Sequence, residues 1–380
     1  MRLRRSPGCA TRAPFKRMGK LSGITVVDLT QFLPGPMMTV MLADQGARVI
    51  KVEPPGGDPA RGQTPFAGEH SVWFANLNRG KESVCIDLKS EEGKRTLQGL
   101  IAGADVFVEG FRPGAVARLG FDYEAVRTLK PDIVYCSISA FGQQGELAHH
   151  PAHDLAVQAL SGFLSVNNAP RGDPVVPGVP SADLAAGLTA LSATLMALLA
   201  RERTGEGAYI DCAMFDSLLP WCAHIAGSAL LGGEPPRSEA QRSLGGAALY
   251  QVYRTADGRH IALGGREVKF ARNLLEGLGR PDLLAEAEKP AGGQERLIAF
   301  LRDTFATRTR AEWETWFKGR DIAFAPVLNF AEALAAPHVA ERGLLVDTGD
   351  GPQIAPAIRF ANGTGTEEDW QPGPVPELKG

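Results

Sequence analysis

The chain has 380 residues, of which 44% are hydrophobic and 22% charged, with a formal net charge of −3. This size and composition are typical of a soluble globular protein with one large or two ordinary domains. Seven of the 40 Lys and Arg residues lie in the first twenty positions, so the rest of the chain carries 33 basic against 43 acidic residues. An acidic body of this kind lacks the basic stripes of nucleic-acid-binding proteins. We therefore expect no nucleic-acid partner.

The first twenty residues, MRLRRSPGCATRAPFKRMGK, contain no acidic residue and lack the apolar run of a secretory signal. Their composition resembles that of a transit peptide, but Met18 followed by GKLSGITVVDL favours a non-native start or a disordered arm. No stretch is expected to reach the roughly twenty apolar residues of a membrane span. The five cysteines include no CxxC pair and are expected as reduced thiols. The sequence thus predicts a cytoplasmic protein without a membrane partner.

Strand-like and helical segments alternate through the first part of the chain. Strands are predicted at ITVVDL, ARVIKVE, 83–88, ADVFVEG and DIVYCSISAFG, and helices at PGPMMTVMLADQG and 91–102. Buried Val and Ile runs that alternate with helices indicate a parallel sheet covered by helices. The predicted fold class is therefore α/β.

After Asp154 the pattern becomes more helical and then changes again. Helices are predicted at LAVQALSGFLSV, from Leu184 to about Arg203, at 269–278, 294–305 and AEWETWFKG. Strands are predicted at 207–215 and 323–328, a polar linker at GGEPPRSEAQRSLGG, and a hairpin on ADGR. PAIRFANG near the C-terminus is expected to return to the first domain. The predicted organisation is a leader at 1–20, a large domain at 21–229, a small domain at 230–330 and a C-terminal return to the large domain at 331–380.

Three motifs of other enzyme classes are missing. The first strand-to-helix turn reads TQFLPGPMM in place of the GxGxxG of dinucleotide-binding folds. The segment 75–82 fails the pattern of a phosphate-binding loop at both ends, and GxSxG does not occur. Nicotinamide or flavin dehydrogenase, nucleotide triphosphatase and serine hydrolase therefore lose their main support.

The densest polar cluster is HHPAHD, residues 149–154. Its imidazoles and carboxylate could ligate zinc, cap the next helix through Asp154, or supply a catalytic group. Asp183 stands in the same situation before a long helix, and capping is again the default interpretation. Both carboxylates are predicted at helix N-termini, where the macrodipole favours the ionised form that a nucleophile needs. We expect no metal centre.

Basic residues beside glycines form a second group at predicted strand ends. Guanidinium and ammonium groups there suit a phosphate-bearing ligand, or an ordinary solvated surface. Adjacent Gly264 and Gly265 allow close approach of the backbone to a ligand, or they end a hairpin. The basic residues of this group are Arg79, Lys81, Arg112 and Arg118.

Eight segments in this order resemble the family III CoA-transferases, the superfamily that includes formyl-CoA transferase, carnitine CoA-transferase and α-methylacyl-CoA racemase. The resemblance extends from about Leu21 to Val346. It rests on LSGITVVDLTQFLPGPMMTVMLADQGARVIKVEPPGGDPAR, NLNRGKESVCIDLKSEEG, ADVFVEGFRPGAVARLGFDYE, IVYCSISAFGQQG, HDLAVQALSG, GVPSADLAAG, ARERTGEGAYIDCAMFD and FAPVLNFAEALAAPHVAERG.

The resemblance implies a Rossmann-like large domain, a smaller α+β domain and an interlocked homodimer. It implies coenzyme A and its thioesters as substrates, together with a carboxylic acid, and no metal. An aspartate at the position of Asp154 forms a mixed anhydride and then an aspartyl-CoA thioester, which is covalent catalysis by a carboxylate. The loop at Gly264 and Gly265 resembles the one that covers this intermediate, whose oxyanions need N–H donors. The resemblance assigns CoA binding to Arg118, Phe111, Arg112, Arg79, Lys81 and Gln31.

One departure keeps a second activity open. Transferases usually have an aromatic residue before the aspartate, whereas this chain has His153, as the racemase branch does. That branch pairs the histidine with residues that match Asp183 and Glu267, and two bases on opposite faces of an α-carbon could carry out a 1,1-proton transfer. Gln158 and the text VQALSG are transferase-like. We favour CoA transfer, with 2-methylacyl-CoA racemisation and non-catalytic CoA binding as alternatives. The sequence does not identify the acyl group.

Overall fold

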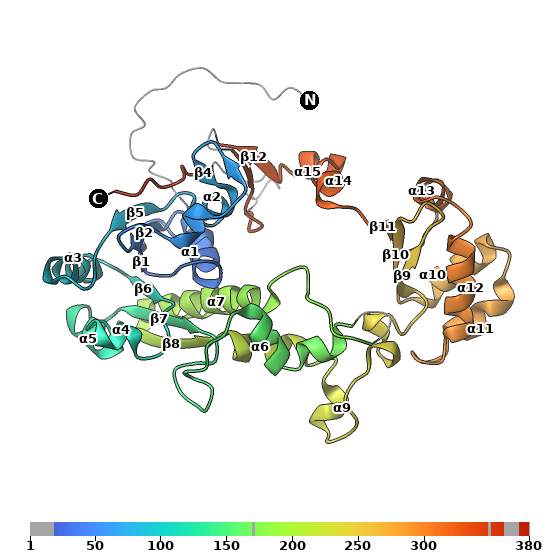
Figure 1. Ribbon diagram of the computed structural model, residues 1–380, viewed down its shortest axis with the longest axis horizontal. Helices are drawn as coiled ribbons and strands as arrows, with labels where there is room; N and C mark the ends of the chain where they lie inside the picture. Colours follow the sequence, from blue (N-terminus) through green and yellow to red (C-terminus); the bar gives the residue numbers. More distant parts are fainter. Residues whose placement is uncertain (1–18, 169–171, 349–350, 361–371, 380) are drawn as a thin grey trace, which may run out of the picture. The chain divides into compact units, whose positions relative to one another are not determined.

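The computed structural model describes residues 19–168, 172–348, 351–360 and 372–379 (Figure 1). The predicted leader, apart from Gly19 and Lys20, lies outside these residues. The chain divides into two compact units. The first comprises the described parts of Met1–Pro151, Asp183–Ser217 and Glu341–Gly380, and the second those of Ala152–Ala182 and Leu218–Ala340. The domain boundaries drawn from the sequence stay predictions.

The first unit contains a six-stranded sheet with the order β5-β2-β1-β6-β7-β8, and every neighbouring pair is parallel. The mixed α/β class with a parallel sheet is therefore confirmed. The runs of Val, Ile and Phe that predicted these strands are buried on both faces in the central ones, as parallel sheets require. The strands are β1 (Thr25–Asp28), β2 (Arg48–Glu53), β5 (Glu82–Cys85), β6 (Val106–Glu109), β7 (Val134–Ser139) and β8 (Ala208–Ala213).

Helices connect these strands, and two of the five that the structure describes up to residue 151 were predicted from the sequence, those that begin at Pro34 and Glu91. One face of the sheet packs against the third to fifth helices through a buried cluster that includes Val27, Val52, Phe107 and Tyr135 from four strands. Because side chains alternate along a strand, residues two positions apart share a face. The helices up to residue 151 are α1 (Pro34–Asp44), α2 (Val72–Asn78), α3 (Glu91–Ala102), α4 (Ala115–Arg118) and α5 (Tyr123–Leu129).

The C-terminal segment completes this unit next to the edge strand β5. The backbone N–H of Cys85 donates to the carbonyl of Lys379 at 2.8 Å, and that of Gly80 donates to Pro374 at 2.8 Å. Arg61 donates to the carbonyl of Pro376 at 3.0 Å. Backbone groups at the open edge of the sheet therefore have partners from the far end of the chain.

Helix α7 (Ser181–Thr204) corrects one expectation from the sequence. Among the described residues it is long and apolar enough to cross a membrane by length and composition, although no such stretch was expected. Half of its apolar window is buried inside the protein. Fully buried alanines, Ala185, Ala186 and Ala190, lie on one face, where their small side chains allow close packing. The core helix of a soluble protein can be as long and as apolar as a membrane-spanning helix.

The second unit has a three-stranded antiparallel sheet with the order β11-β10-β9. Strands β9 (Tyr250–Arg254) and β10 (His260–Gly264) form the hairpin predicted on ADGR, and β11 (Phe324–Pro326) pairs with β10. The sheet packs on an aromatic core that includes Trp313. The helices around this core are α10 (Val268–Gly277), α11 (Leu284–Ala287), α12 (Glu295–Phe305) and α13 (Arg310–Phe317).

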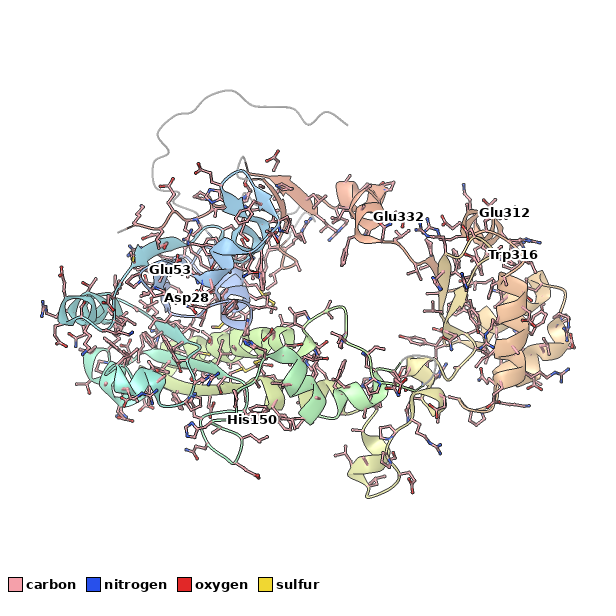
Figure 2. The ribbon with its side chains drawn as sticks, viewed as in Figure 1. Asp28, Glu53, His150, Glu312, Trp316 and Glu332 are labelled. Carbon is pink, nitrogen blue, oxygen red and sulfur yellow. The ribbon has the colours of Figure 1, made fainter. Side chains whose placement is uncertain are left out.

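A short helix after β11 is held to this sheet by charge. Glu332 of α14 (Phe330–Leu334), labelled in Figure 2, forms ion pairs with Arg310 and Arg259. Asn329 caps the same helix. The second unit also contains α6 (Asp154–Leu160), which ends earlier than LAVQALSGFLSV predicted because Gly162 takes a left-handed φ of 81° and begins a separate 3-10 turn.

Candidate functional site

The strand order of the first unit marks the place where a ligand is expected. From β1 the chain adds β2 and β5 on one side, and then β6, β7 and β8 on the other. The direction reverses between β1 and β6, and in open parallel sheets ligands bind at the carboxyl ends of the strands at such a reversal. Gln31 follows β1 and is exposed, and Phe111 follows β6. These two predicted CoA-binding residues therefore lie at the same edge, at the reversal point.

The turn after β6 and the short helix that follows it carry two further predicted positions, Arg112 and Arg118. Gly114 adopts a left-handed φ of 78° and begins α4, which ends at Arg118. The ring of Phe111 packs against the buried cluster beneath the turn. Arg112 and Arg118 are exposed and form no ion pair with another described residue. Their guanidinium groups are thus available to an anionic ligand.

Lys81 was predicted to bind CoA and lies instead in a buried ion pair at the end of β1. Its ammonium group is 3.1 Å from Oδ2 of Asp28, and neither side chain is exposed. The same ammonium donates to Oγ1 of Thr39 and Oδ1 of Asn78, each at 2.8 Å. Burial lowers the pKa of Lys81 to about 8, although the Asp28 carboxylate opposes this shift. The side chain offers no charge at the protein surface.

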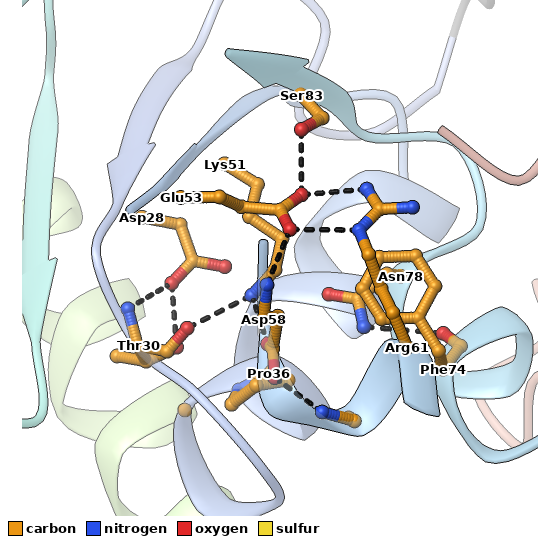
Figure 3. A network of polar contacts seen from close by, with 12 residues as sticks. Asp28, Thr30, Pro36, Lys51, Glu53, Asp58, Arg61, Phe74, Asn78 and Ser83 are labelled. Carbon is orange, nitrogen blue, oxygen red and sulfur yellow. Dashed lines mark hydrogen bonds and ion pairs between the residues drawn. The ribbon is translucent and has the colours of Figure 1, made fainter. Parts of the chain in front are cut away.

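The same cluster extends to the neighbouring strand β2, as Figure 3 shows. Nζ of Lys51 lies 2.8 Å from Oδ2 of Asp58 and donates to the carbonyl of Thr30 at 2.8 Å. The backbone N–H of Thr30 donates to Oδ1 of Asp28 at 2.9 Å. The network therefore fixes the start of the turn that leads to Gln31.

Arg79, the other basic residue of NRGKES, is also buried. Its guanidinium forms a bidentate pair with Asp44 of α1, with distances of 3.0 and 2.6 Å. Arg79 and Lys81, which were predicted to be cations on a surface loop, therefore each form a buried ion pair. The sequence around Arg79 and Lys81 does not distinguish them from surface residues, because their buried partners, Asp44 and Asp28, are distant in sequence.

Asp154 is the first residue of α6, and its carboxylate bonds to a different helix. Oδ1 accepts from the backbone N–H of Ala182 at 2.8 Å, which is one of the unpaired donors at the start of α7. Oδ2 accepts from Nε2 of Gln158, one turn further along α6. The prediction that Asp154 caps its own helix is wrong, since His153 is the N-cap residue and forms no side-chain cap bond. Asp183 is the third residue of α7 and lies within its first turn, so its predicted N-cap position is also wrong.

The histidines of HHPAHD do not form a metal cluster in the described part of the chain. No group of three His, Cys, Asp or Glu side chains there is arranged to hold an ion. His150, labelled in Figure 2, packs edge-on against Phe141 with ring centroids 5.8 Å apart. His153 is exposed and adjacent to Asp154. The cluster is therefore a loop that leads to Asp154.

The predicted glycine loop lies at the end of β10. The N–H of Gly264 donates to Ala323 at 3.0 Å and that of Gly265 to Leu249 at 2.9 Å, so both are engaged in backbone bonds. A Cβ on Gly265 would lie 2.8 Å from the ring of Phe270, which explains the need for glycine. Glu267 is exposed, and the backbone N–H of Arg266, which donates to its carboxylate at 3.0 Å, lowers its pKa. The two glycine N–H groups are not free oxyanion donors in this structure.

The predicted site residues thus fall into two groups, one in each unit. Asp154 and Ala182, whose bond spans separate helices, could not be linked by sequence spacing. Glu109 at the end of β6 was not considered at all, and its only signal is an acidic residue that ends an apolar strand directly before a glycine turn. The first unit holds Gln31, Arg79, Lys81, Phe111, Arg112, Arg118 and Asp183, and the second holds His153, Asp154, Gly264, Gly265 and Glu267.

Comparison with known proteins gives a consistent family. The sequence model of CoA-transferase family III matches residues 21–379. Acetyl-CoA:oxalate CoA-transferase of Acetobacter aceti is 36% identical over 343 residues, which cover 88% of each chain. Succinyl-CoA:glutarate CoA-transferase of Homo sapiens is 33% identical over 357 residues, 90% of this chain and 80% of that one.

Two further matches concern the alternative activity and the fold. The α-methylacyl-CoA racemase of Homo sapiens is 34% identical over 361 residues, 94% of this chain and 86% of the racemase. The crystal structure of a CaiB/BaiF family protein from Brucella suis superposes with a TM-score of 0.81 at 30% identity, and covers 95% of this chain and 97% of that one.

Proposed function

Because the chain belongs to CoA-transferase family III, we propose that it moves CoA between carboxylic acids through covalent intermediates on Asp154. The observation that carries this proposal is the position of the Asp154 carboxylate. It is half-buried, accepts from the first turn of the 24-residue helix α7, and is held by Gln158 on its other oxygen. A helix N-terminus stabilises a carboxylate as an anion, which is the nucleophilic form.

The reaction proceeds through exchange at this carboxylate. An oxygen of Asp154 attacks the carbonyl carbon of the donor acyl-CoA, the C–S bond breaks, and CoA leaves as a thiolate. The thiolate then attacks the aspartyl carbonyl of the mixed anhydride, so the donor acid leaves and an aspartyl-CoA thioester remains. The acceptor carboxylate attacks this thioester, and the released thiolate attacks the acyl carbon of the second anhydride. The new acyl-CoA leaves, and Asp154 is regenerated as a carboxylate.

We propose that the CoA nucleotide binds at the reversal point of the parallel sheet. Arg112 and Arg118 are exposed cations on the turn after β6, and Gln31 follows the adjacent strand β1. Guanidinium groups suit the phosphates of CoA. Lys81 supports this edge indirectly through its buried ion pair with Asp28 at the end of β1, whereas Arg79 pairs with Asp44 at the end of α1, next to the start of β2.

For the acceptor we propose a small carboxylic acid, with dicarboxylates as the first candidates. Two relatives are named for oxalate and glutarate. A dicarboxylate offers one carboxylate to the aspartyl thioester and a second for recognition. The enzyme needs no resident cofactor for this chemistry, because CoA is itself the exchanged substrate.

Racemisation of a 2-methylacyl-CoA is the second candidate. His153 is exposed beside Asp154, Asp183 lies in the first turn of α7, and a racemase is among the relatives. This mechanism requires removal of the α-proton by one base and its return by another. CoA transfer leaves the α-hydrogen in place, which provides the distinction.

One experiment separates these activities. Enzyme incubated with succinyl-CoA and then with hydroxylamine is expected to lose activity and to carry a hydroxamate at Asp154 by mass spectrometry. The control is the same treatment without acyl-CoA. In heavy water, transfer to glutarate should proceed without deuterium at the α-carbon of glutaryl-CoA. Absence of any trapped species contradicts CoA transfer, and α-deuteration of 2-methylacyl-CoA without acceptor acid supports the racemase.

We also propose that the working unit is an interlocked homodimer without a membrane partner. One face of α7 exposes Leu188, Met196 and Leu199 at 39%, 70% and 65%, which is unusual for a soluble helix. Light scattering is expected to give twice the mass of one chain. Leu199→Glu should shift the protein toward monomer, whereas Glu206→Lys, an exposed change just beyond the helix, should not. A monomeric wild type contradicts this proposal.

A further inference from the structure

Glu109 ends β6 at the reversal point of the sheet and is 1% exposed. Its Oε2 accepts from the backbone N–H of Phe111 at 2.7 Å, across the turn that follows the strand. Its Oε1 accepts from the hydroxyl of Ser137, which lies directly opposite on β7. Each carboxyl oxygen therefore holds one neighbouring element.

Ser137 continues the connection to the next loop. Nε2 of Gln143 donates to Oγ of Ser137 at 2.7 Å, and the backbone N–H of Gln143 donates to Asp211 of β8 at 3.0 Å. A chain of hydrogen bonds therefore joins the turn after β6 to the loop at Gln143.

The environment of Glu109 is unusual for a buried acid. No Lys or Arg forms an ion pair with it in the part of the chain that the structure describes, unlike Asp28 and Glu53 at the same sheet edge. Burial raises the pKa of Glu109, and the nearby Asp211 carboxylate raises it further, whereas the bonds from Ser137 and Phe111 oppose the shift. A buried carboxyl without an ion-pair partner lowers the stability of the folded state, which suggests that Glu109 has a role other than stabilising the fold.

We propose that Glu109 is a positioning residue for CoA, whose carboxyl fixes the turn 110–114 through the Phe111 N–H so that Arg112 faces the ligand. This inference rests on the proposed CoA site. The turn has a glycine at each end, Gly110 and Gly114, the latter at positive φ, and within it the backbone is restrained chiefly at Pro113. The hydrogen bond from the Phe111 N–H to Glu109 and the packing of the Phe111 ring restrain the rest of the turn. They thereby fix the direction of the adjacent, exposed Arg112 toward the proposed ligand.

Calorimetric titration with CoA tests this role. Glu109→Ala is expected to raise the dissociation constant by about tenfold, as loss of one hydrogen bond to a charged group does. The kcat of the folded variant at saturating succinyl-CoA and acceptor acid should stay within about threefold of wild type, since the nucleophile is untouched. Glu109→Gln keeps an oxygen for Phe111, and its amide can donate to Ser137, so its affinity should remain near that of wild type.

The matched control is Asp105→Ala, at the opposite edge of the sheet next to the start of β6. Asp105 accepts from Thr25 and pairs with Arg201, so its removal lowers stability without contact to the turn. Equal loss of CoA affinity in this variant, or in Glu109→Gln, overturns the proposal. If Glu109→Ala does not fold, Ser137→Ala should still weaken CoA binding by about threefold, and an unchanged affinity overturns the proposal.

A second readout separates this inference from the proposed function. Amide hydrogen exchange in the turn 110–114 should become faster in Glu109→Ala than in Glu109→Gln, with or without CoA. Wild-type protein that binds no CoA contradicts the proposed function, whereas unchanged exchange in the turn contradicts the positioning by Glu109.

Discussion

Asp154→Asn is expected to lower the rate of CoA transfer by about 10³-fold or more, since it removes the attacking oxygen anion while leaving the fold in place. The amide oxygen of asparagine can still accept from the Ala182 N–H. Its amide nitrogen would face Gln158, whose Oε1 is buried and has no hydrogen-bond partner. A flip of the Gln158 amide gives this nitrogen an acceptor, so we expect a well-folded variant.

Steady-state transfer from succinyl-CoA, with CoA binding by calorimetry, measures this effect. Affinity for CoA should stay close to that of wild type, and no hydroxamate should form with hydroxylamine. Asp173→Asn changes an exposed carboxylate elsewhere in the second unit and should leave transfer unaffected. Full activity of the Asp154 variant would exclude the covalent route.

Lys81→Met is expected to lower the free energy of unfolding by about 3–5 kcal/mol, the usual effect of leaving one charge of a buried pair without its partner. Asp28 would keep its hydrogen bonds from Thr30 and Thr39 but would lose the ammonium group at 3.1 Å. Urea unfolding followed by circular dichroism measures the change. The exposed pair of Arg48 and Glu82 provides the control, and Arg48→Ala should cost no more than about 1 kcal/mol.

The effect of this substitution should also depend on pH. Burial opposes ionisation of Asp28, but the Lys81 and Lys51 ammonium groups and two hydroxyls outweigh it and lower its pKa from 3.8 to about 2. A depressed carboxyl pKa stabilises the folded state above the unfolded value, and this contribution is lost as pH falls through the folded value. The deficit of Lys81→Met should therefore be full at about pH 7 and smaller at about pH 3. An equal deficit at both pH values would show that charge plays no part.

The elements of the fold were largely predictable because they depend on local patterns. The periods of apolar residues gave the strands from β1 to β8 that form the parallel sheet, and glycine and proline gave the ends of α1 and α3. The family resemblance drawn from eight ordered motifs is confirmed by the match over residues 21–379. Each of these inferences rests on residues that are close in sequence.

The parts of the site that were missed depend on pairs that are distant in sequence. Ala182 lies 28 positions from Asp154, so spacing suggested only that Asp154 would cap the helix beside it. Lys81 lies 53 positions from Asp28, and its glycine-flanked motif is the same whether the side chain is buried or exposed. Glu109 was overlooked because a single acid at a strand end has many ordinary explanations.

The use of the C-terminal segment to cover the edge strand β5 has a consequence for synthesis on the ribosome. The second unit, which ends at Ala340, is complete in the nascent chain before residues 374–379 have been made. Until then the backbone of Gly80 and Cys85 lacks its partners, and the edge of the sheet is open to pairing with another chain. Residues 374–379 therefore close a part of the fold that was begun much earlier in synthesis, and removal of these residues should promote aggregation of newly synthesised protein.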